Sequence, residues 1–269
     1  MLVLALDTST AACTVALVEL GAPASVAVGS GPERVLAQRC VWDARRHGEL
    51  LAPMMSAVLT EARVRPPDVA AVVVGVGPGP FTSLRVGMVT GSAFAAALGI
   101  PAHGVCSLDG IGLGTAGPVG VVTDARRREV FWARYQDGAR QGEPAVGAPA
   151  AVAADLLAAG VRRVVGPGVA LYPEAFASFE PVTRLVGESG QPDAGPAGPA
   201  GPAGASICPA PPLLVRVAAA AILDGRAPGP LVPLYLRRPD AAEPRPPKTV
   251  TAATEAGAGD PAAAGATAG

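Results

Sequence analysis

Apolar runs separated by short polar turns dominate the first hundred residues. Residues 2–6 and 13–19 predict two strands around a Thr/Ser loop, and residues 35–42 predict a third. The wholly apolar run 69–74 predicts a strand that is buried on both faces. Helical spacing of apolar residues over 48–64 predicts a helix, with Pro53 in its first turn, where a missing N–H is tolerated.

A second helix follows the buried strand. Its small residues begin after the turn Gly-Val-Gly-Pro-Gly-Pro and end near Leu98 and Gly99. The later part of the chain again alternates strands and helices, which is typical of an α/β fold. The predicted elements there are strands at 120–123, 130–135 and 163–165 and helices at 150–159 and 213–223.

The pattern divides the chain into lobes. We expect an N-terminal lobe over residues 1–100 and a second lobe over 101–239, which includes a returning C-terminal helix. A Gly-Pro-Ala repeat at 190–205 predicts a flexible insertion. The Ala/Gly/Pro/Thr-rich residues 240–269 predict a disordered tail.

The net charge, the length of the apolar runs and the cysteine spacing argue against several functional classes. A formal net charge of −1 provides no overall basic field for nucleic acid or an anionic membrane. The start of the chain lacks a basic region, and we count no apolar run of about 18 residues, so we expect a cytoplasmic protein without a membrane partner. The four cysteines lie far apart without a Cys-x-x-Cys pair, which predicts free thiols and neither a zinc site nor a disulfide framework.

Two glycine- or hydroxyl-rich loops are candidates for binding phosphate. In the loop Asp7-Thr8-Ser9-Thr10, hydroxyls and backbone N–H groups suit phosphate and the carboxylate suits hydrated Mg²⁺, but the same groups also satisfy a tight turn. The turn from Gly75 to Arg85 lets backbone approach a ligand at a helix N-terminus, or forms only a sharp turn capped by Thr82 or Ser83. The candidate nucleotide contacts in these loops are Asp7, Ser9, Thr10, Gly77, Gly79 and Arg85.

The two predicted helices of the first lobe also carry candidate contact faces. Gly87, Gly91 and Ala95 recur every four residues, a spacing that allows close packing either inside the subunit or against another molecule. The broad apolar face of the other helix suits a core or a partner equally well. The candidate partner residues on the two helices are Leu50, Leu51, Met54, Met55, Val58, Gly87, Met88, Gly91 and Ala95.

Residues for metal or acid–base chemistry are scarce. A metal site on a helix needs ligands on one face, yet Leu51 stands four residues after His47 and the other histidine is His103. The predicted metal and catalytic sets are therefore empty. The run Arg126-Arg127-Arg128 is compatible with tRNA phosphates, but we interpret it as a solvated hairpin turn because no aromatic run accompanies it.

Five motifs occur in an order that identifies a family. They are Asp-Thr-Ser-Thr, His-Gly-Glu-Leu-Leu-Ala-Pro, Gly-Pro-Gly-Pro-Phe-Thr-Ser-Leu-Arg, Asp-Ala-Arg-Arg-Arg-Glu-Val-Phe-Trp-Ala-Arg-Tyr and Pro-Leu-Tyr-Leu-Arg. With them the chain resembles the TsaB (YeaZ) family from residue 1 to about residue 240, apart from the Gly-Pro-Ala insertion. The resemblance implies an actin-like (ASKHA, ribonuclease H-like) two-lobed fold with mixed sheets flanked by helices.

The resemblance also implies a function and partners. TsaB-like subunits belong to the bacterial machinery that makes N6-threonylcarbamoyladenosine in tRNA, and they pair through N-lobe helices with a catalytic TsaD subunit, whose His-x-x-x-His they lack. A TsaE-like ATPase joins the pair, a homodimer is an alternative for the isolated chain, and tRNA is reached through the complex. ADP or ATP is implied only at the subunit interface. One departure is Ser83, which stands where the family usually has glycine, and it weakens the expectation of a nucleotide contact.

Two enzymatic alternatives stay open beside this non-catalytic reading. Asp7 and the glycine-rich turn are compatible with a stand-alone actin-like ATPase or small-molecule kinase. A metallopeptidase is the other alternative, and it lacks a second histidine on the helix that begins with His47.

Overall fold

A computed structural model describes residues 1–21, 33–182, 185 and 207–237. The predicted insertion at 190–205 and the predicted tail at 240–269 lie outside these residues. The chain from Met1 to Arg237 forms one compact unit. The predicted division at residue 100 stays a prediction, although the first sheet continues beyond it to Val105.

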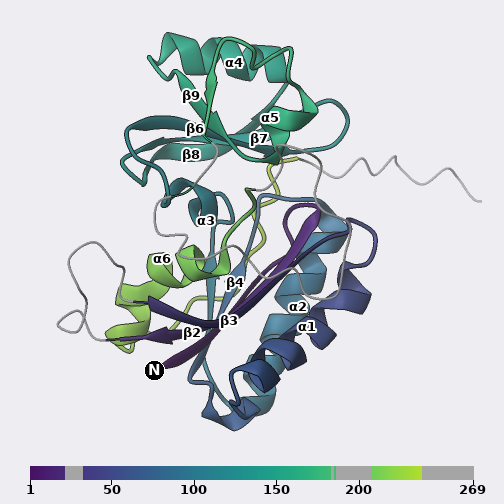
Figure 1. The fold of residues 1–269 in the computed structure, drawn as a ribbon, viewed down its shortest axis with the longest axis vertical. Helices are drawn as coiled ribbons and strands as arrows, with labels where there is room; N and C mark the ends of the chain where they lie inside the picture. Colours follow the sequence, from purple (N-terminus) through teal and green to yellow (C-terminus); the bar gives the residue numbers. More distant parts are fainter. Residues whose placement is uncertain (22–32, 183–184, 186–206, 238–269) are drawn as a thin grey trace, which may run out of the picture. The chain divides into compact units, whose positions relative to one another are not determined.

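The first sheet has five strands in the order β3-β2-β1-β4-β5 (Figure 1). β1 pairs antiparallel with β2, which pairs antiparallel with β3, whereas β1 and β5 both pair parallel with β4. β1 and β4 are buried along almost their whole length, as their continuous apolar runs predict. The strand bounds are β1 Leu2–Asp7, β2 Ala12–Leu20, β3 Glu33–Trp42, β4 Ala71–Gly75 and β5 Ala102–Val105.

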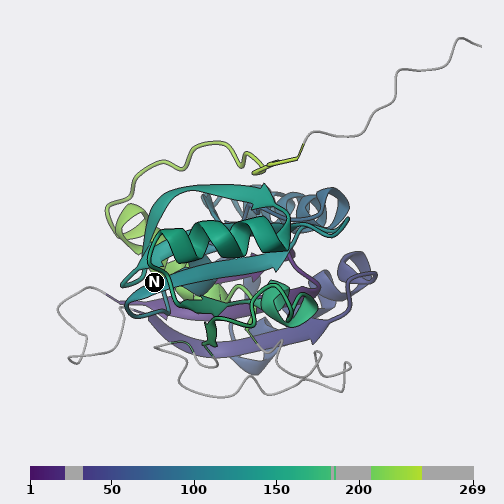
Figure 2. The same cartoon turned by 90° about the horizontal axis from the view of Figure 1, so that it is seen from above.

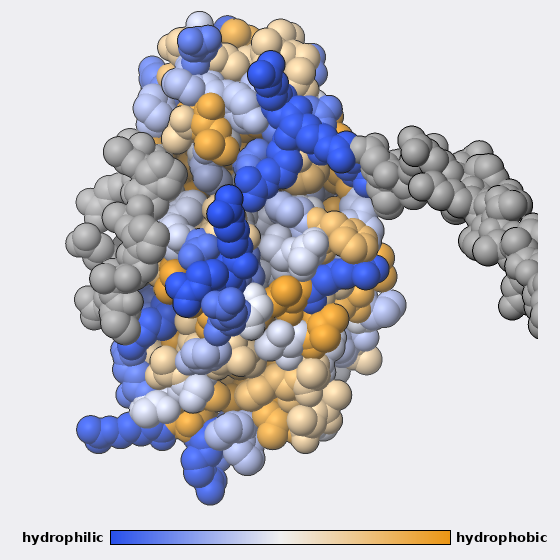
Figure 3. Space-filling view, turned by 90° about the vertical axis from the view of Figure 1, so that its right-hand side faces the viewer, coloured by the Kyte–Doolittle hydropathy of each residue, from blue (hydrophilic) through white to orange (hydrophobic). Residues whose placement is uncertain are grey.

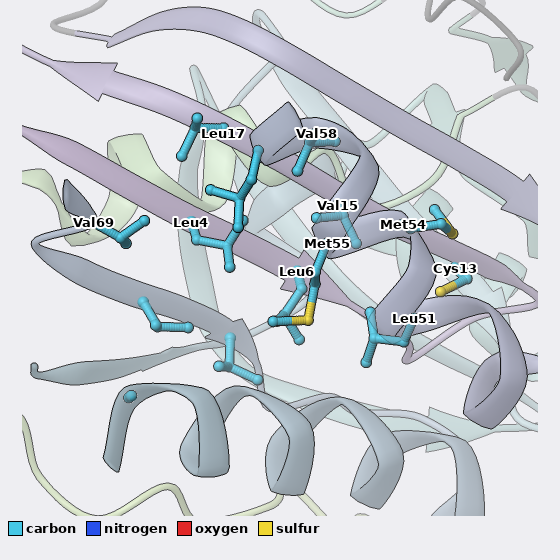
Figure 4. Close-up of a cluster of buried hydrophobic side chains, with 14 of the residues drawn as sticks. Leu4, Leu6, Cys13, Val15, Leu17, Leu51, Met54, Met55, Val58 and Val69 are labelled. Carbon is cyan, nitrogen blue, oxygen red and sulfur yellow. The ribbon is translucent and has the colours of Figure 1, made fainter. Parts of the chain in front are cut away.

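Helices cover both faces of this sheet. α1 (His47–Glu61) and α2 (Phe81–Leu98) lie side by side on one face, and α6 (Pro211–Leu223) packs on the other (Figure 1). The cluster under α1 includes Leu4, Leu6, Leu51, Met55 and Val58, which point toward one another between helix and sheet (Figure 4). A short 3-10 turn, η2 (Pro66–Asp68), precedes β4.

The second sheet repeats the pairing scheme of the first. Its order is β10-β9-β6-β7-β8, with antiparallel β6–β7 and β7–β8 pairs and parallel β6–β9 and β9–β10 pairs. α4 (Pro149–Ala158) covers this sheet (Figure 2). α5 (Pro167–Leu171) packs on β6 and β9, and α3 (Asp109–Gly112) contacts α6. The strand bounds are β6 Pro118–Asp124, β7 Val130–Gln136, β8 Ala139–Gly147, β9 Arg163–Val165 and β10 Glu180–Pro181.

Two local expectations were wrong. Pro53 lies inside α1 rather than in its first turn, because the helix already begins at His47. α2 has Pro80 as its N-cap without a side-chain cap, and the Ser83 hydroxyl donates to the Pro80 carbonyl at 3.1 Å. α2 is also long and apolar enough to cross a membrane, by length and composition alone, over its 18 residues. A single helix of this kind is weak evidence, since helices that pack on a protein core pass the same test.

Candidate functional site

The loop between β1 and β2 is held by its own side chains. The buried Asp7 carboxylate accepts hydrogen bonds at Oδ1 from the Ser9 N–H (2.8 Å) and the Ser9 hydroxyl (2.7 Å). Its Oδ2 accepts from the Ser107 hydroxyl at 2.5 Å, and that hydroxyl in turn accepts from the Gly77 N–H at 3.0 Å. Burial raises the pKa of Asp7, and the hydrogen bonds from Ser107 and Ser9 partly oppose this effect.

The threonine hydroxyls of the loop also form hydrogen bonds within the chain. The Thr8 hydroxyl donates to the Ser83 carbonyl at 2.6 Å and accepts from the Gly87 N–H at 3.1 Å, so it fastens the loop to the first turns of α2. The Thr10 hydroxyl accepts from the Ala12 N–H at 3.2 Å. The loop groups that suit phosphate are therefore used to bind the chain to itself.

The glycines of the second candidate loop make room for the first loop. A Cβ on Gly75 would lie 1.7 Å from Asp7 Oδ2, and one on Gly79 would lie 2.5 Å from the Ser9 carbonyl oxygen. Gly77 has a φ of 95°, a backbone conformation that glycine adopts without strain. Of the predicted nucleotide contacts, Asp7, Ser9, Gly77 and Gly79 come together, but in close mutual packing.

Arg85 points elsewhere. Its Nε donates to the Tyr235 hydroxyl at 3.2 Å, and its guanidinium lies 4.0 Å from the centre of the Phe81 ring. Phe81 and Tyr235 stack with their centroids 5.2 Å apart. The sequence did not predict this cluster, because its members are 150 positions apart in the chain.

Most predicted partner residues of α1 and α2 lie in the core of the chain itself. Leu50 is half-buried, and the other eight are buried. A Cβ on Gly87 would meet Thr8 Oγ1 at 2.4 Å, and one on Gly91 would meet Val74 at 2.6 Å. The small-residue stripe therefore allows close packing on β1 and β4 within the chain. This corrects the prediction that the stripe itself is a contact face for a partner.

What the two helices expose is a different set of residues. An apolar groove with a volume of about 440 Å³ runs between them. It is lined by Ala52, Met55, Ser56, Leu59, Thr60, Val64, Pro66, Thr90 and Phe94. Residues 50–60 and 86–98 contain no Asp, Glu, Lys or Arg. Orange to white residues accordingly gather in the lower half of Figure 3, on the side where α1 and α2 lie in Figure 1.

Charged residues frame this uncharged region, here called the α1–α2 face. The ion pair of Arg46 with Glu49 (2.9 Å) lies at the start of α1, and Arg39 pairs with Glu61 at its end. Arg65 pairs with Asp68 at 3.0 Å just beyond. An uncharged centre with a charged rim is the usual anatomy of a protein–protein interface.

The histidine of the predicted metal motif is buried. His47 is 3% exposed, and its Nε2 has no hydrogen-bond partner among the described residues. Leu51, on the same helical face, is fully buried in the core. Within the described part of the chain, no three His, Cys, Asp or Glu side chains come together in a way that could hold a metal ion.

A second cavity, of about 520 Å³, lies beside β5 and α6. Its polar lining includes His103, Asp109 and Arg140. Asp109 accepts a hydrogen bond from the Tyr135 hydroxyl at 2.6 Å, and Arg140 Nε lies 3.6 Å from the same oxygen. Asp109 and Arg140 of this cavity are thus paired with each other, and Arg226, which also lines it, pairs with Asp224.

Comparison with known proteins connects this geometry to a family. Residues 42–176 match the family model of TsaD, tRNA N6-adenosine threonylcarbamoyltransferase. A solved structure of YeaZ from Pseudomonas aeruginosa is 29% identical, with a TM-score of 0.62, and the match covers 87% of this chain and 99% of that one. The TsaB protein of Escherichia coli, named for tRNA threonylcarbamoyladenosine biosynthesis, is 33% identical over 51% of this chain and 55% of its own length. The chain belongs to the TsaB (YeaZ) family.

Membership confirms the predicted fold. The two mixed sheets flanked by helices form the actin-like α/β fold of TsaB. An uncharacterized protein of Mycobacterium tuberculosis strain H37Rv is 44% identical over 89% of this chain and 93% of its own length. Against an uncharacterized protein of Mycobacterium leprae with the same identity, the chain spans 56% of the relative's length. The Escherichia coli and Bacillus subtilis relatives are both named as tRNA threonylcarbamoyladenosine biosynthesis proteins TsaB.

Proposed function

We propose that this chain is a non-catalytic subunit that activates a TsaD-like tRNA threonylcarbamoyltransferase by pairing with it through the α1–α2 face. The observation that carries the proposal is the absence of charged residues from 50–60 and 86–98, two stretches that leave an open apolar groove between their helices. An open apolar groove between two uncharged stretches is costly to leave in water, and a partner that covers it removes that cost.

The kind of partner follows from the matched family model. The match to TsaD includes both α1 and α2, so a TsaD-like chain has a corresponding helix pair. Related surfaces can pack against each other around an approximate two-fold axis, as identical surfaces do in homodimers. A four-helix contact of this kind buries the groove lining of both chains, and a homodimer is the same contact made with a second copy.

Two features of the chain support the proposed non-catalytic role. The Asp7 carboxylate is fully buried and bound by Ser9 and Ser107, which leaves neither of its oxygens for a ligand. The position four residues after His47 carries Leu51, whose side chain packs in the core. We therefore assign the transfer reaction to the partner, and a stand-alone ATPase or kinase centred on Asp7 is disfavoured by the same contacts.

We also propose for this chain the further partners that are implied by the family. We assign ADP or ATP to the junction with the partner rather than to the Asp7 loop, where the chain's own groups occupy the space. A TsaE-like ATPase would join the assembled pair, in the cytoplasm, where tRNA is modified.

Direct binding tests the contact. Ser56 and Thr90 lie on opposite walls of the groove, so the double change Ser56→Glu and Thr90→Glu places two carboxylates in a dry interface. We expect it to weaken binding to a TsaD-like protein from the same source at least 100-fold in calorimetry. The matched control is Ala151→Glu with Ala154→Glu, which adds the same two charges at exposed positions of α4 and should bind like the wild type. Unchanged binding of the groove variant would refute this interface.

A further inference from the structure

Three consecutive arginines form the turn between β6 and β7. Arg126, Arg127 and Arg128 have φ values of 61°, 53° and 59°, and all three are exposed. The Asp124 carboxylate accepts the Arg126 N–H at 2.8 Å, and the Glu129 N–H donates to the Arg126 carbonyl at 3.0 Å. These bonds fix a left-handed turn that presents three arginine side chains at the surface.

The C-terminal segment brings aromatic residues to this turn. Arg237 donates to the Ala125 carbonyl at 3.2 Å and forms an ion pair with Glu129. Tyr235 lies two positions earlier, so its Cα is within about 7 Å of that of Arg237. Tyr235 carries the stack with Phe81 and the hydrogen bond from Arg85. The C-terminal segment therefore links the two clusters into one candidate surface.

The surface is basic although the chain is not. Five arginines lie on it; Arg126 forms an ion pair with Asp124, and Arg237 forms one with Glu129. A band of hydrophilic residues, drawn in blue, crosses Figure 3 above the apolar region. The arginines of the surface are Arg85, Arg126, Arg127, Arg128 and Arg237.

Aromatic rings are exposed within this basic surface. Phe81 is 47% exposed and Tyr235 is 38% exposed, although large aromatic side chains usually turn inward. Tyr172 lies close enough to Asp124, Arg126 and Arg128 for their charges to act on its phenol. Guanidinium groups bind phosphates and aromatic rings stack on unpaired bases, so this combination suits single-stranded RNA better than an acidic protein or a lipid surface.

We propose that the surface formed by the Arg126–Arg128 turn, Arg85, Phe81 and Tyr235 contacts an unpaired segment of tRNA, with the arginines on phosphates and the rings against a base. The proposal rests on the proposed function, which makes tRNA the substrate of the assembled pair. It adds that this subunit touches the RNA itself, through residues distinct from the groove lining of the α1–α2 face.

Charge removal at the turn tests the contact. The triple change Arg126→Asn, Arg127→Asn and Arg128→Asn removes three charges, and asparagine tolerates the left-handed backbone. The matched control, Arg34→Gln, Arg162→Gln and Arg226→Gln, removes three exposed arginines elsewhere. Each full-length chain is assembled with its TsaD-like partner, and the affinity for a labelled tRNA transcript is measured between 50 and 200 mM salt.

We expect the turn variant to bind tRNA at least tenfold more weakly at low salt. The slope of log affinity against log salt should fall by about 2, since each lost phosphate contact contributes about 0.7–0.9. Tyr235→Ala should weaken binding about fivefold or more with an unchanged slope, because stacking involves no counterion release. The control triple should behave like the wild type.

Pairing measured on the same samples separates the two proposals. If the turn variant pairs with the partner normally and its tRNA affinity and slope equal those of the wild type, the RNA surface is refuted and the proposed function stands. If the wild-type chain does not pair with the TsaD-like partner at all, the proposed function is refuted. Normal pairing with selective loss of tRNA affinity supports both.

Discussion

At the scale of single residues, the loop with the phosphate-binding motif forms hydrogen bonds within the chain instead. The oxygens of Asp7 are bound by Ser9 and Ser107, while Thr8 ties the loop to α2. The motif letters predicted a loop between two strands. They could not predict its use, because Ser107 lies 100 positions away and only the folded chain brings its hydroxyl to Asp7.

The buried carboxylate gives a prediction about stability and pH. Burial raises the pKa of Asp7 in the folded chain above its unfolded value, so the folded state binds the proton more tightly. The stabilising effect of that proton is complete below the unfolded pKa and is lost as pH rises through the folded pKa. We expect Asp7→Asn to become more stable relative to the wild type as pH rises from about 4 to 7.

Urea unfolding at several pH values measures this difference. Asp155→Asn changes an exposed aspartate of α4 and is the matched control. A difference between Asp7→Asn and the wild type that is the same at pH 4 and pH 7 would contradict the account of Asp7.

At the scale of elements, apolar patterns predicted most of the structure. The strands at 2–6, 13–19 and 163–165 and the helix that ends at Leu98 are found within one or two residues of their predicted bounds. The strand β8 was missed because it is largely exposed and contains Gly142 and Pro144, which interrupt any alternation. The strand β5 was missed because it has four residues, among them a histidine and a glycine.

The stripe of small residues on α2 gives the prediction at this scale. A Cβ on Gly91 would lie 2.6 Å from Val74, so Gly91→Leu forces a branched side chain between α2 and β4. We expect it to lower the free energy of unfolding by about 1–3 kcal/mol. Ala93→Leu, at an exposed position of the same helix, is the control and should change it little. Equal melting temperatures of the two variants would show that the stripe does not pack as described.

At the scale of the whole molecule, the second sheet repeats the strand order of the first. The motifs and their order predicted the family and its fold, and the comparisons confirm both. The surfaces could not be predicted in the same way. The apolar residues that the sequence assigned to a partner are mostly core, and the face left outside is made of small, uncharged residues that carry little signal on their own.

The direct test of the central claim is threonylcarbamoyl transfer to tRNA by a purified TsaD-like enzyme, with and without this chain. We predict strong stimulation by the wild type and by the control Ala151→Glu with Ala154→Glu. The groove variant Ser56→Glu with Thr90→Glu should lose at least nine-tenths of that stimulation while it remains folded, because it cannot pair. Equal transfer rates with the wild type, with the folded groove variant and without either chain would contradict the account of this protein as an activating subunit.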